Sequence, residues 1–502
     1  MQTEFLAMDA VVEHITMSTT TSRKRPDGQQ IRPHPPTASQ FEVWVAKRTR
    51  RVQEQRQTAP RSRTDPLQYR LCAKFLRFKR LVDGYVRICH FRRVMMCVLG
   101  CSRFVSDALN SVWIRFVSDF DSLNDAEGFH PEFAHQHFGD NETIYGYDDL
   151  AVNLYYSATT MFLYPELSFS TVVSSVEKDM KEDNIIAKLK DQLPSDQMSM
   201  MVDSKEQFQV LLAKQKNFKP YGELITKFSA RDKCFELYKI TESSPEFDSF
   251  LARVQSLALW YIDASQYTDN SDPLWMHYFL FESKANEAGD GSRVYALAGY
   301  ASLYRFYAYP ERIRPRIAQI LLLPQFRKSG IGAKLLNAVY KDLCSIKAVL
   351  DITAEDPADN FVLLRDYVDC VNCSKLPEFA PEKLKDGFTA EMRDAAQQKL
   401  KINKRQSRRV YEILRLKCTN MKNPAEAKAF RLDVKRRLEL PMRRNERDWK
   451  KIQRALDDDE YAQVAASCVN TEQKMQQLQQ LYEAEVDAYK MTIQRMTVHP
   501  DI

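Results

Sequence analysis

The residues best placed to do chemistry lie in one short run of the chain. Residues 317–333 read IAQILLLPQFRKSGIGA, a pattern that predicts an apolar strand, a basic loop and then a helix. The first N–H groups of a helix lack backbone partners and carry partial positive charge, which suits phosphate. Gly330 and Gly332 leave room for a pyrophosphate, and Arg327 and Lys328 add charge.

Two other phosphate-binding motifs fit this loop poorly. A dinucleotide-binding fingerprint needs a third glycine at the right step, which does not follow here, and no strand–helix–strand unit precedes the loop. A P-loop needs Gly-Lys followed by Ser or Thr, which this run lacks. A plain connection between a strand and a helix is the alternative that the loop alone leaves open.

A second run ends a predicted strand with two neighbouring carboxylates. Residues 349–357 read VLDITAEDP, so Glu355 and Asp356 stand directly before a proline. A lysine amine must lose its proton before it attacks a thioester, and its unperturbed pKa is about 10.4. A carboxylate at a strand end, partly withdrawn from water, suits the general base for that step. Because Asp before Pro is also common in turns, both interpretations stay open for Asp356, whereas Glu355 favours catalysis.

The segments around these runs predict the sheet that positions them. Residues 277–282 and 294–306 have the composition of two antiparallel strands joined by a glycine-containing turn. A third strand over 316–323 is largely apolar, so we expect it to be buried on both faces. A helix over 333–343 and a fourth strand over 348–353 follow. An antiparallel pair that leads into a strand–helix–strand unit predicts an α+β fold with a mixed sheet.

Composition divides the 502 residues into five segments. Residues 21–105 hold twenty Lys and Arg against five Asp and Glu, which sets a basic, largely disordered extension apart from the rest. The last third of the chain has helical periodicity, including residues 388–416, and its end predicts an amphipathic helix or coiled coil. We predict the extension over residues 1–107, an N-terminal domain over 108–255 and a central core over 256–375. A helical domain over 376–456 and the final helix over 457–502 follow.

The bulk composition argues against several classes of protein. No window of eighteen uncharged apolar residues occurs, so we expect no membrane span, and the N-terminus lacks the pattern of a secretory signal. Ten cysteines in a chain of this length predict free thiols in a reducing compartment. Cys370 and Cys373 are spaced like half of a zinc site, but no second ligand pair accompanies them, so we expect no metal.

Several runs together resemble one family, the catalytic subunits of the type B histone acetyltransferases. The basic loop matches the Arg/Gln-x-x-Gly-x-Gly/Ala pattern of the acetyltransferases related to the Gcn-five type. The likeness extends from about residue 110 to about residue 454 and rests on residues 138–143, 350–357, 364–366, 401–404 and 408–416. It implies an acetyltransferase-type mixed sheet flanked by helices, with an N-terminal α+β domain and a C-terminal helical domain.

The resemblance also implies a role for each candidate site residue. The implied general base is Glu355, with Asp263 and Asp356 as further acidic candidates. The residues implied in acetyl-CoA binding, from the pantetheine arm to the pyrophosphate, are Ile320, Leu321, Leu322, Arg327, Lys328, Ser329, Gly330, Ile331, Gly332, Ala333 and Asn360. Those implied in binding a basic histone tail are Asp140, Asn141, Glu142, Tyr304, Arg305 and Phe306. Lys328 stands where the family usually has a glycine, and we expect acetyl-CoA binding to survive this change.

A function and partners are implied as well. The family acetylates newly made histone H4 before chromatin assembly, with a WD-repeat histone chaperone as partner, in both cytoplasm and nucleus. We therefore expect transfer of acetyl from acetyl-CoA to a lysine amine of a histone tail. Two alternatives stay open. The first is a catalytically silent histone-binding scaffold, against which the retained Glu355, Gly330 and Gly332 argue. The second is a nucleic-acid-binding protein that uses the basic extension.

Overall fold

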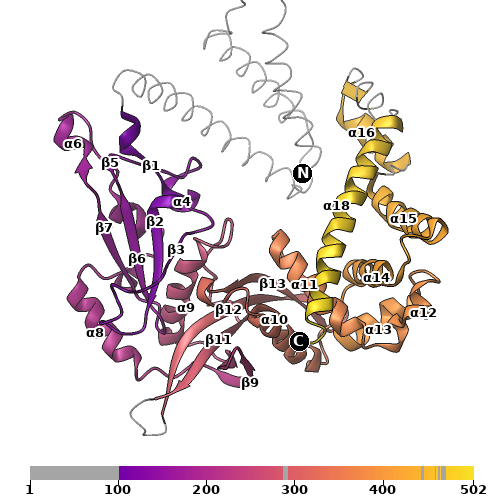
Figure 1. Ribbon diagram of the computed structural model, residues 1–502, viewed down its shortest axis with the longest axis horizontal. Helices are drawn as coiled ribbons and strands as arrows, with labels where there is room; N and C mark the ends of the chain where they lie inside the picture. The colour runs from indigo at the N-terminus through magenta and orange to yellow at the C-terminus, as the bar shows by residue number, and fades with distance from the viewer. Residues whose placement is uncertain (1–100, 287–291, 443–445, 458–459, 462–463, 465–470) are drawn as a thin grey trace, which may run out of the picture. The chain divides into compact units, whose positions relative to one another are not determined.

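The computed structural model describes residues 101–502, apart from 287–291, 443–445, 458–459, 462–463 and 465–470 (Figure 1). The chain divides into two compact units, Met1–Leu99 and Gly100–Ile502, and only the second is described below. The predicted basic extension therefore lies almost entirely outside the described residues. Within the described residues, no helix combines the length and the apolar character that crossing a membrane requires.

The largest sheet has six strands in the order β14-β13-β12-β11-β10-β9 (Figure 1). β11 pairs antiparallel with β12, and β12 with β13, whereas β13 and β14 run parallel. This topology confirms the predicted antiparallel pair and the mixed sheet of an α+β fold. The strands are β9 Glu223–Ala230, β10 Lys233–Lys239, β11 Trp275–Ala285, β12 Arg293–Ala308, β13 Arg312–Leu322 and β14 Thr353–Ala354.

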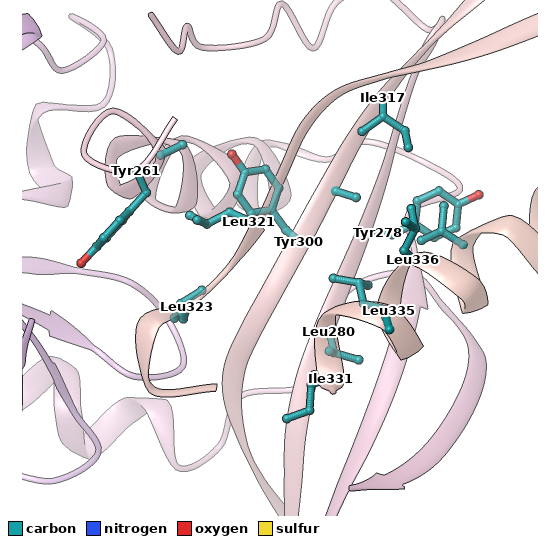
Figure 2. Packing of buried hydrophobic residues seen from close by; sticks show 14 of the residues in the cluster. Tyr261, Tyr278, Leu280, Tyr300, Ile317, Leu321, Leu323, Ile331, Leu335 and Leu336 are labelled. Atoms are coloured by element: carbon teal, nitrogen blue, oxygen red, sulfur yellow. The ribbon is translucent and has the colours of Figure 1, made fainter. Parts of the chain in front are cut away.

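The prediction that the third strand is buried on both faces is wrong. From Pro315 to Leu322, the residues of β13 alternate between buried and half-buried. Ile317 and Leu321 belong to the core, and Leu321 points in beside Tyr300 (Figure 2). Of the half-buried residues, Ala318, Ile320 and Leu322 line a cavity instead. Apolar composition alone could not distinguish a second packed face from the lining of a binding site.

The predicted fourth strand is also shorter than expected. Of residues 348–353, only Thr353 belongs to β14, because the backbone bonds of this segment are divided between two neighbours. Leu350 donates its N–H to β13, at Ile313, over 2.9 Å. Two residues later, Ile352 donates its N–H to Lys401, on the other side, over 2.8 Å.

Two helices cover the opposite faces of the large sheet. Neighbouring residues of a strand point to opposite faces, and Tyr278 and Phe279 of β11 do so. Tyr278 lies among the leucines of α10 Ile331–Ser345 and donates a hydrogen bond of 2.6 Å to Asp342 (Figure 2). Phe279 packs against Phe250 of α9 Pro245–Ala258, with ring centroids 5.2 Å apart. The predicted helix over 333–343 is confirmed, and α10 packs on the face of the sheet to which Tyr278 points.

A second sheet, with strand order β3-β2-β6-β7, forms most of the N-terminal region. The N–H groups of Glu132 and Phe133 both donate to the carbonyl of Trp260, which fixes this region to the segment after α9. The strands are β1 Val105–Asp107, β2 Val112–Val117, β3 Gly128–Phe129, β4 Thr143–Tyr145, β5 Tyr147–Asp148, β6 Ala151–Ser157, β7 Leu163–Ser168 and β8 Thr171–Val172. The helices are α4 Ala108–Ser111, α5 His135–Phe138, α6 Val173–Val176, α7 Ile185–Lys190 and α8 Lys205–Gln215.

The C-terminal region is helical, as the fold prediction requires (Figure 1). The pattern over 388–416 forms two helices rather than one, because Lys401 adopts a left-handed conformation at φ 57°. The last helix packs against α11, α14 and α15 of the same chain. The helices are α11 Asp359–Cys373, α12 Pro381–Leu384, α13 Ala390–Leu400, α14 Lys404–Cys418, α15 Pro424–Glu439, α16 Glu446–Ala455 and α18 Thr471–Val498.

Candidate active site

A cavity of about 1110 Å³ lies along the β14 side of β13. Its walls are the loop between β13 and α10, the segment between β14 and α11, the segment after α9, and the last turns of α18. The two runs that carry the predicted chemistry therefore meet in one place, although more than twenty residues separate Gly330 from Glu355. The described residues around it come from both ends of the chain's second unit.

The edge of β13 opens where β14 ends. Only Arg316 and Ile317 pair with β14, and the N–H of Glu355 closes this pairing with a bond of 2.9 Å to the carbonyl of Ile317. Beyond Ile317, no described strand lies on this edge as far as Leu322. Alternate backbone groups of a strand point to each edge, so this stretch offers N–H and C=O groups to an extended ligand. Of the predicted pantetheine contacts, Ile320 and Leu322 also face the cavity with their side chains.

The loop after β13 leaves the start of α10 uncapped. Gly330 precedes the helix in a left-handed conformation at φ 79°, and no side chain caps the first N–H groups. A Cβ at Gly330 would meet open space, since no atom of the described residues other than its chain neighbours lies within 4 Å of that position. Lys328 is also left-handed, at φ 56°, and its carbonyl accepts a hydrogen bond of 2.9 Å from Arg231. The backbone thus presents a positively polarised helix end to the cavity.

The two predicted cationic residues of the loop, Arg327 and Lys328, differ in whether a carboxylate pairs with them. Arg327 forms an ion pair with Glu132, donates to the carbonyl of Leu322 over 3.0 Å and stacks on Tyr261 at 4.9 Å. Its charge is therefore already compensated by a carboxylate. Lys328 also lines the cavity and has no ion pair within the described part of the chain.

Of the other predicted loop residues, Ser329, Ile331 and Ala333 are not among the residues that line the cavity. Ile331 and Ala333, in the first turn of α10, have side chains buried in the core. Ser329 donates its hydroxyl to the carbonyl of Phe326 over 2.5 Å, which closes the loop on itself. Gly332 lines the cavity, and a Cβ there would make an ordinary contact of 3.7 Å with Leu364.

All three predicted acidic residues line the same cavity. Glu355 and Asp356 are exposed at the end of β14, and Asp356 has a positive φ of 30°. Asp263 follows α9, with its side chain 71% exposed and one oxygen 3.5 Å from Nε2 of His135. Asn360, in the first turn of α11, lines the cavity as well. The arrangement places proton acceptors beside the open edge of β13.

The acidic turn predicted to meet a basic tail lies outside the lining. Asp140 and Asn141 are exposed, but Glu142 turns inward. Its carboxylate accepts N–H groups of Ala134 and His135, over 2.6 and 3.0 Å, at the start of α5. Glu142 therefore holds local structure, and His135 connects this turn to Asp263 at the cavity.

The predicted contacts on β12 are likewise bound within the chain. Tyr304 donates a hydrogen bond of 2.8 Å to Asp272, and Arg305 binds the carbonyl groups of Pro273 and Leu274. Phe306 is 38% exposed and lies under the guanidinium of Arg316. None of the three lines the cavity, whereas the ring neighbour of Tyr304, Trp275, does.

Several residues of the cavity were not predicted from the sequence to belong to the site. They are Glu132, Tyr261, Tyr267 and the α18 residues Met491, Gln494, Arg495, Val498 and His499. The hydroxyls of Tyr261 and Tyr267 are buried and have no hydrogen-bond partner among the described residues. Burial raises the pKa of both phenols, so they stay neutral at physiological pH. An aromatic residue beside an apolar strand predicts a core position equally well, which hid these residues from a reading of the sequence.

The spaced cysteines do not take part in this site. Cys370 and Cys373 are buried in α11, where burial raises the pKa of both thiols. Within the described ranges, no group of three His, Cys, Asp or Glu is placed to hold a metal ion.

An open strand edge, an uncapped glycine-containing helix start and carboxylates at the next strand end together define an acetyltransferase. Comparison with known proteins identifies the family. A family model described as "Histone acetyl transferase HAT1 N-terminus" matches residues 104–263, and one described as "Histone acetyltransferase type B catalytic subunit, C-terminal" matches residues 365–416. The chain belongs to the family of type B histone acetyltransferase catalytic subunits, and it is an acyltransferase that uses acetyl-CoA.

Two relatives show the extent of the likeness. The histone acetyltransferase type B catalytic subunit of Homo sapiens is 36% identical over 389 residues, which cover 76% of this chain and 90% of that protein. A Dictyostelium discoideum protein of the same description is 30% identical over 343 residues, or 63% of this chain and 69% of that protein. Among solved structures, an aminoglycoside acetyltransferase from a soil metagenomic sample is 14% identical with a TM-score of 0.20, covering 26% of this chain and 82% of that one. That last likeness is too small to add to the assignment.

Proposed function

We propose that this protein transfers acetyl from acetyl-CoA to a lysine of a histone tail, most specifically that of histone H4, with Glu355 as the general base. One observation carries the proposal. The carboxylates of Glu355 and Asp356 lie beside the open edge of β13, in the cavity that the uncapped start of α10 also borders. Such a site joins phosphate binding, amide binding and proton acceptance, which acetyl transfer from coenzyme A to an amine requires together.

The β13 side of the site supports binding of the donor. The free N–H groups at the start of α10 and the ammonium of Lys328 suit a pyrophosphate. The unpaired backbone groups between Ile317 and Leu322 suit the amides of a pantetheine arm, as a sheet edge suits an added strand. When bound, acetyl-CoA supplies a thioester whose carbonyl carbon is open to attack by an amine.

The β14 side of the site supports removal of a proton. A free lysine at pH 7 is almost wholly protonated, since its pKa is about 10.4. The bond from the N–H of Glu355 to Ile317 fixes that residue at the strand end, while its carboxylate stays exposed to the cavity. Glu355 would first accept a proton from the lysine ammonium. The neutral amine would then attack the thioester carbonyl, and as the C–S bond breaks coenzyme A would leave as a thiolate that takes up the second proton lost from the nitrogen. Asp356 and Asp263 would keep the site negative and so favour a cationic side chain.

The choice of substrate and partner is the finer part of the proposal. Asp263 and the exposed Asp140 supply negative charge near the cavity and the acidic turn, and a Lys/Arg-rich tail needs such partners. Newly made histone H4, a WD-repeat histone chaperone, and action in both nucleus and cytoplasm before chromatin assembly follow from the family resemblance.

The test measures transfer of labelled acetyl from acetyl-CoA to an H4 tail peptide by the full chain and by Glu355→Gln. Glu391→Gln, an exposed glutamate on α13 outside the cavity lining, is the matched control. We expect the rate constant of Glu355→Gln to fall by about 10²–10⁴-fold, and that of the control to stay unchanged. An unchanged rate in Glu355→Gln would move the base to Asp356 or Asp263. Binding of acetyl-CoA without any transfer by the intact chain would favour the scaffold alternative.

A further inference from the structure

The last turns of α18 form one wall of the active-site cavity. Met491, Gln494, Arg495, Val498 and His499 line it, as do residues in the first turns of α11. The wall is therefore built by two helices that lie far apart in the sequence. Because the same cavity borders the open edge of β13, a ligand on that edge would share the cavity with this wall.

Specific contacts hold the end of α18 in this place. Tyr367 of α11 donates its hydroxyl to the carbonyl of His499 over 2.9 Å. Farther along, Lys375 lies 3.7 Å from the carboxylate of Asp501. Near the middle of α18, Tyr489 is fully buried and donates a hydrogen bond of 2.8 Å to Glu412. The side chains at the end of α18 are thus presented to the cavity by a packed helix.

The charges in the cavity lining single out one residue of this wall. The lining holds three Lys or Arg side chains, which are Arg327, Lys328 and Arg495. Arg327 is already paired with Glu132. Arg495 stacks on the ring of Tyr367 at 4.8 Å, and neither an ion pair nor a hydrogen bond of its guanidinium is found within the described ranges. Lys328 and Arg495 are therefore the cations of this lining that remain available to an anionic ligand.

We propose that Arg495 binds a phosphate group of coenzyme A, so that α18 completes the donor-binding site. The inference rests on the proposed function, because it takes coenzyme A as the ligand of this cavity. The contact with the ring of Tyr367 holds the guanidinium beside the cavity, and no described group accepts a hydrogen bond from its N–H groups. A guanidinium in this state suits phosphate, which it can bind through two parallel hydrogen bonds. Coenzyme A offers two such groups, the pyrophosphate and the ribose 3′-phosphate.

The test compares dissociation constants of the full chain for coenzyme A and for dephospho-coenzyme A by titration calorimetry. Arg495→Met removes the charge and keeps most of the packing on Tyr367, while Arg495→Lys keeps the charge. Lys490→Met, on an exposed part of α18 outside the lining, is the matched control. We expect Arg495→Met to raise the dissociation constant for coenzyme A by about 10- to 100-fold. Arg495→Lys should show a smaller rise, and the control none.

The outcomes separate the two phosphates and the two proposals. A loss seen with both ligands would assign the pyrophosphate to Arg495, and a loss seen with coenzyme A alone would assign the 3′-phosphate. Unchanged binding by Arg495→Met would overturn the inference, and so would equal losses in both Arg495 variants accompanied by a lower unfolding temperature. Absence of coenzyme A binding by the unaltered chain would instead overturn the proposed function.

Discussion

The loop before α10 and the helical bundle of α11, α14, α15 and α18 are both rich in basic residues, but they use charge differently. In the bundle, Glu412 is fully buried and accepts hydrogen bonds from Arg408, Arg437 and Tyr489. In the loop, Lys328 has no carboxylate partner within the described part of the chain, and α10 begins without a cap. The bundle pairs its charged side chains with one another, whereas the loop before α10 leaves positive charge facing a cavity.

This difference separates groups that hold the fold from groups that bind a ligand. A buried charge is tolerated only when partners replace the water that it has lost, so the bundle network fixes how its helices meet. A charge at a cavity rim stays hydrated and can exchange water for phosphate. Arg495 belongs to the bundle by position but resembles the loop in lacking a carboxylate partner among the described residues. This contrast within α18 supports assigning Arg495 to the binding site.

The largest expected effect is a loss of stability when the buried carboxylate of the bundle is removed. Glu412→Ala leaves Arg408 and Arg437 without their shared buried carboxylate and should lower the free energy of unfolding by about 3–5 kcal/mol. Urea unfolding followed by circular dichroism measures this loss. Glu391→Ala, which removes an exposed glutamate of the same type, should change the free energy by no more than about 0.5 kcal/mol. A loss below about 1 kcal/mol for Glu412→Ala would mean that the network does not hold the bundle.

The strand, loop and helix start around Gly330 could be predicted from the sequence because their signals are local. Gly330 and Gly332 stand at the start of a helix whose apolar periodicity is plain, and the end of the preceding strand is largely apolar. The same holds for the carboxylates of Glu355 and Asp356, which follow directly on a hydrophobic strand. Propensity and periodicity act over a few residues, so features that depend on them can be read without the fold.

The rest of the site depends on contacts between distant segments. The ion pair between Arg327 and Glu132, and the placement of Arg495 beside Tyr367, join residues that no local pattern relates. The same limit affects Glu142, whose acidic turn suggested an open surface. The carboxylate in fact accepts hydrogen bonds from N–H groups at the start of α5, and the sequence alone does not indicate this contact.

The two loop glycines test whether the cavity side depends on backbone freedom. Gly330→Ala places a side chain at φ 79° and should lower the free energy of unfolding by about 1–2 kcal/mol, although its Cβ meets open space. Gly332→Ala, inside the first turn of α10, makes only an ordinary contact and should stay within about 1 kcal/mol of the unaltered chain. Thermal and urea unfolding of both variants measure the difference. Equal losses at the two positions would contradict the assignment of strain to Gly330 alone.

Lys328 gives the smallest expected change in stability and the sharpest test of the loop. Its left-handed backbone at φ 56° favours glycine. Lys328→Gly should raise the free energy of unfolding by up to about 1 kcal/mol, since relief of the backbone exceeds the entropy that glycine adds to the unfolded chain. The hydrogen bond from Arg231 is kept because it ends on the carbonyl of this residue.

Affinity for coenzyme A should move in the opposite direction. Removing the ammonium should raise the dissociation constant by about tenfold, as expected for a hydrogen bond to a charged group. Lys328→Ala keeps the left-handed conformation and loses the charge, so it should lose the affinity without gaining the stability. Calorimetric titration and urea unfolding of both variants separate the two effects. If Lys328→Gly gained stability and kept full affinity, the free positive charge of the loop would have no role in binding, and the contrast with the bundle would rest on the helix start and Arg495.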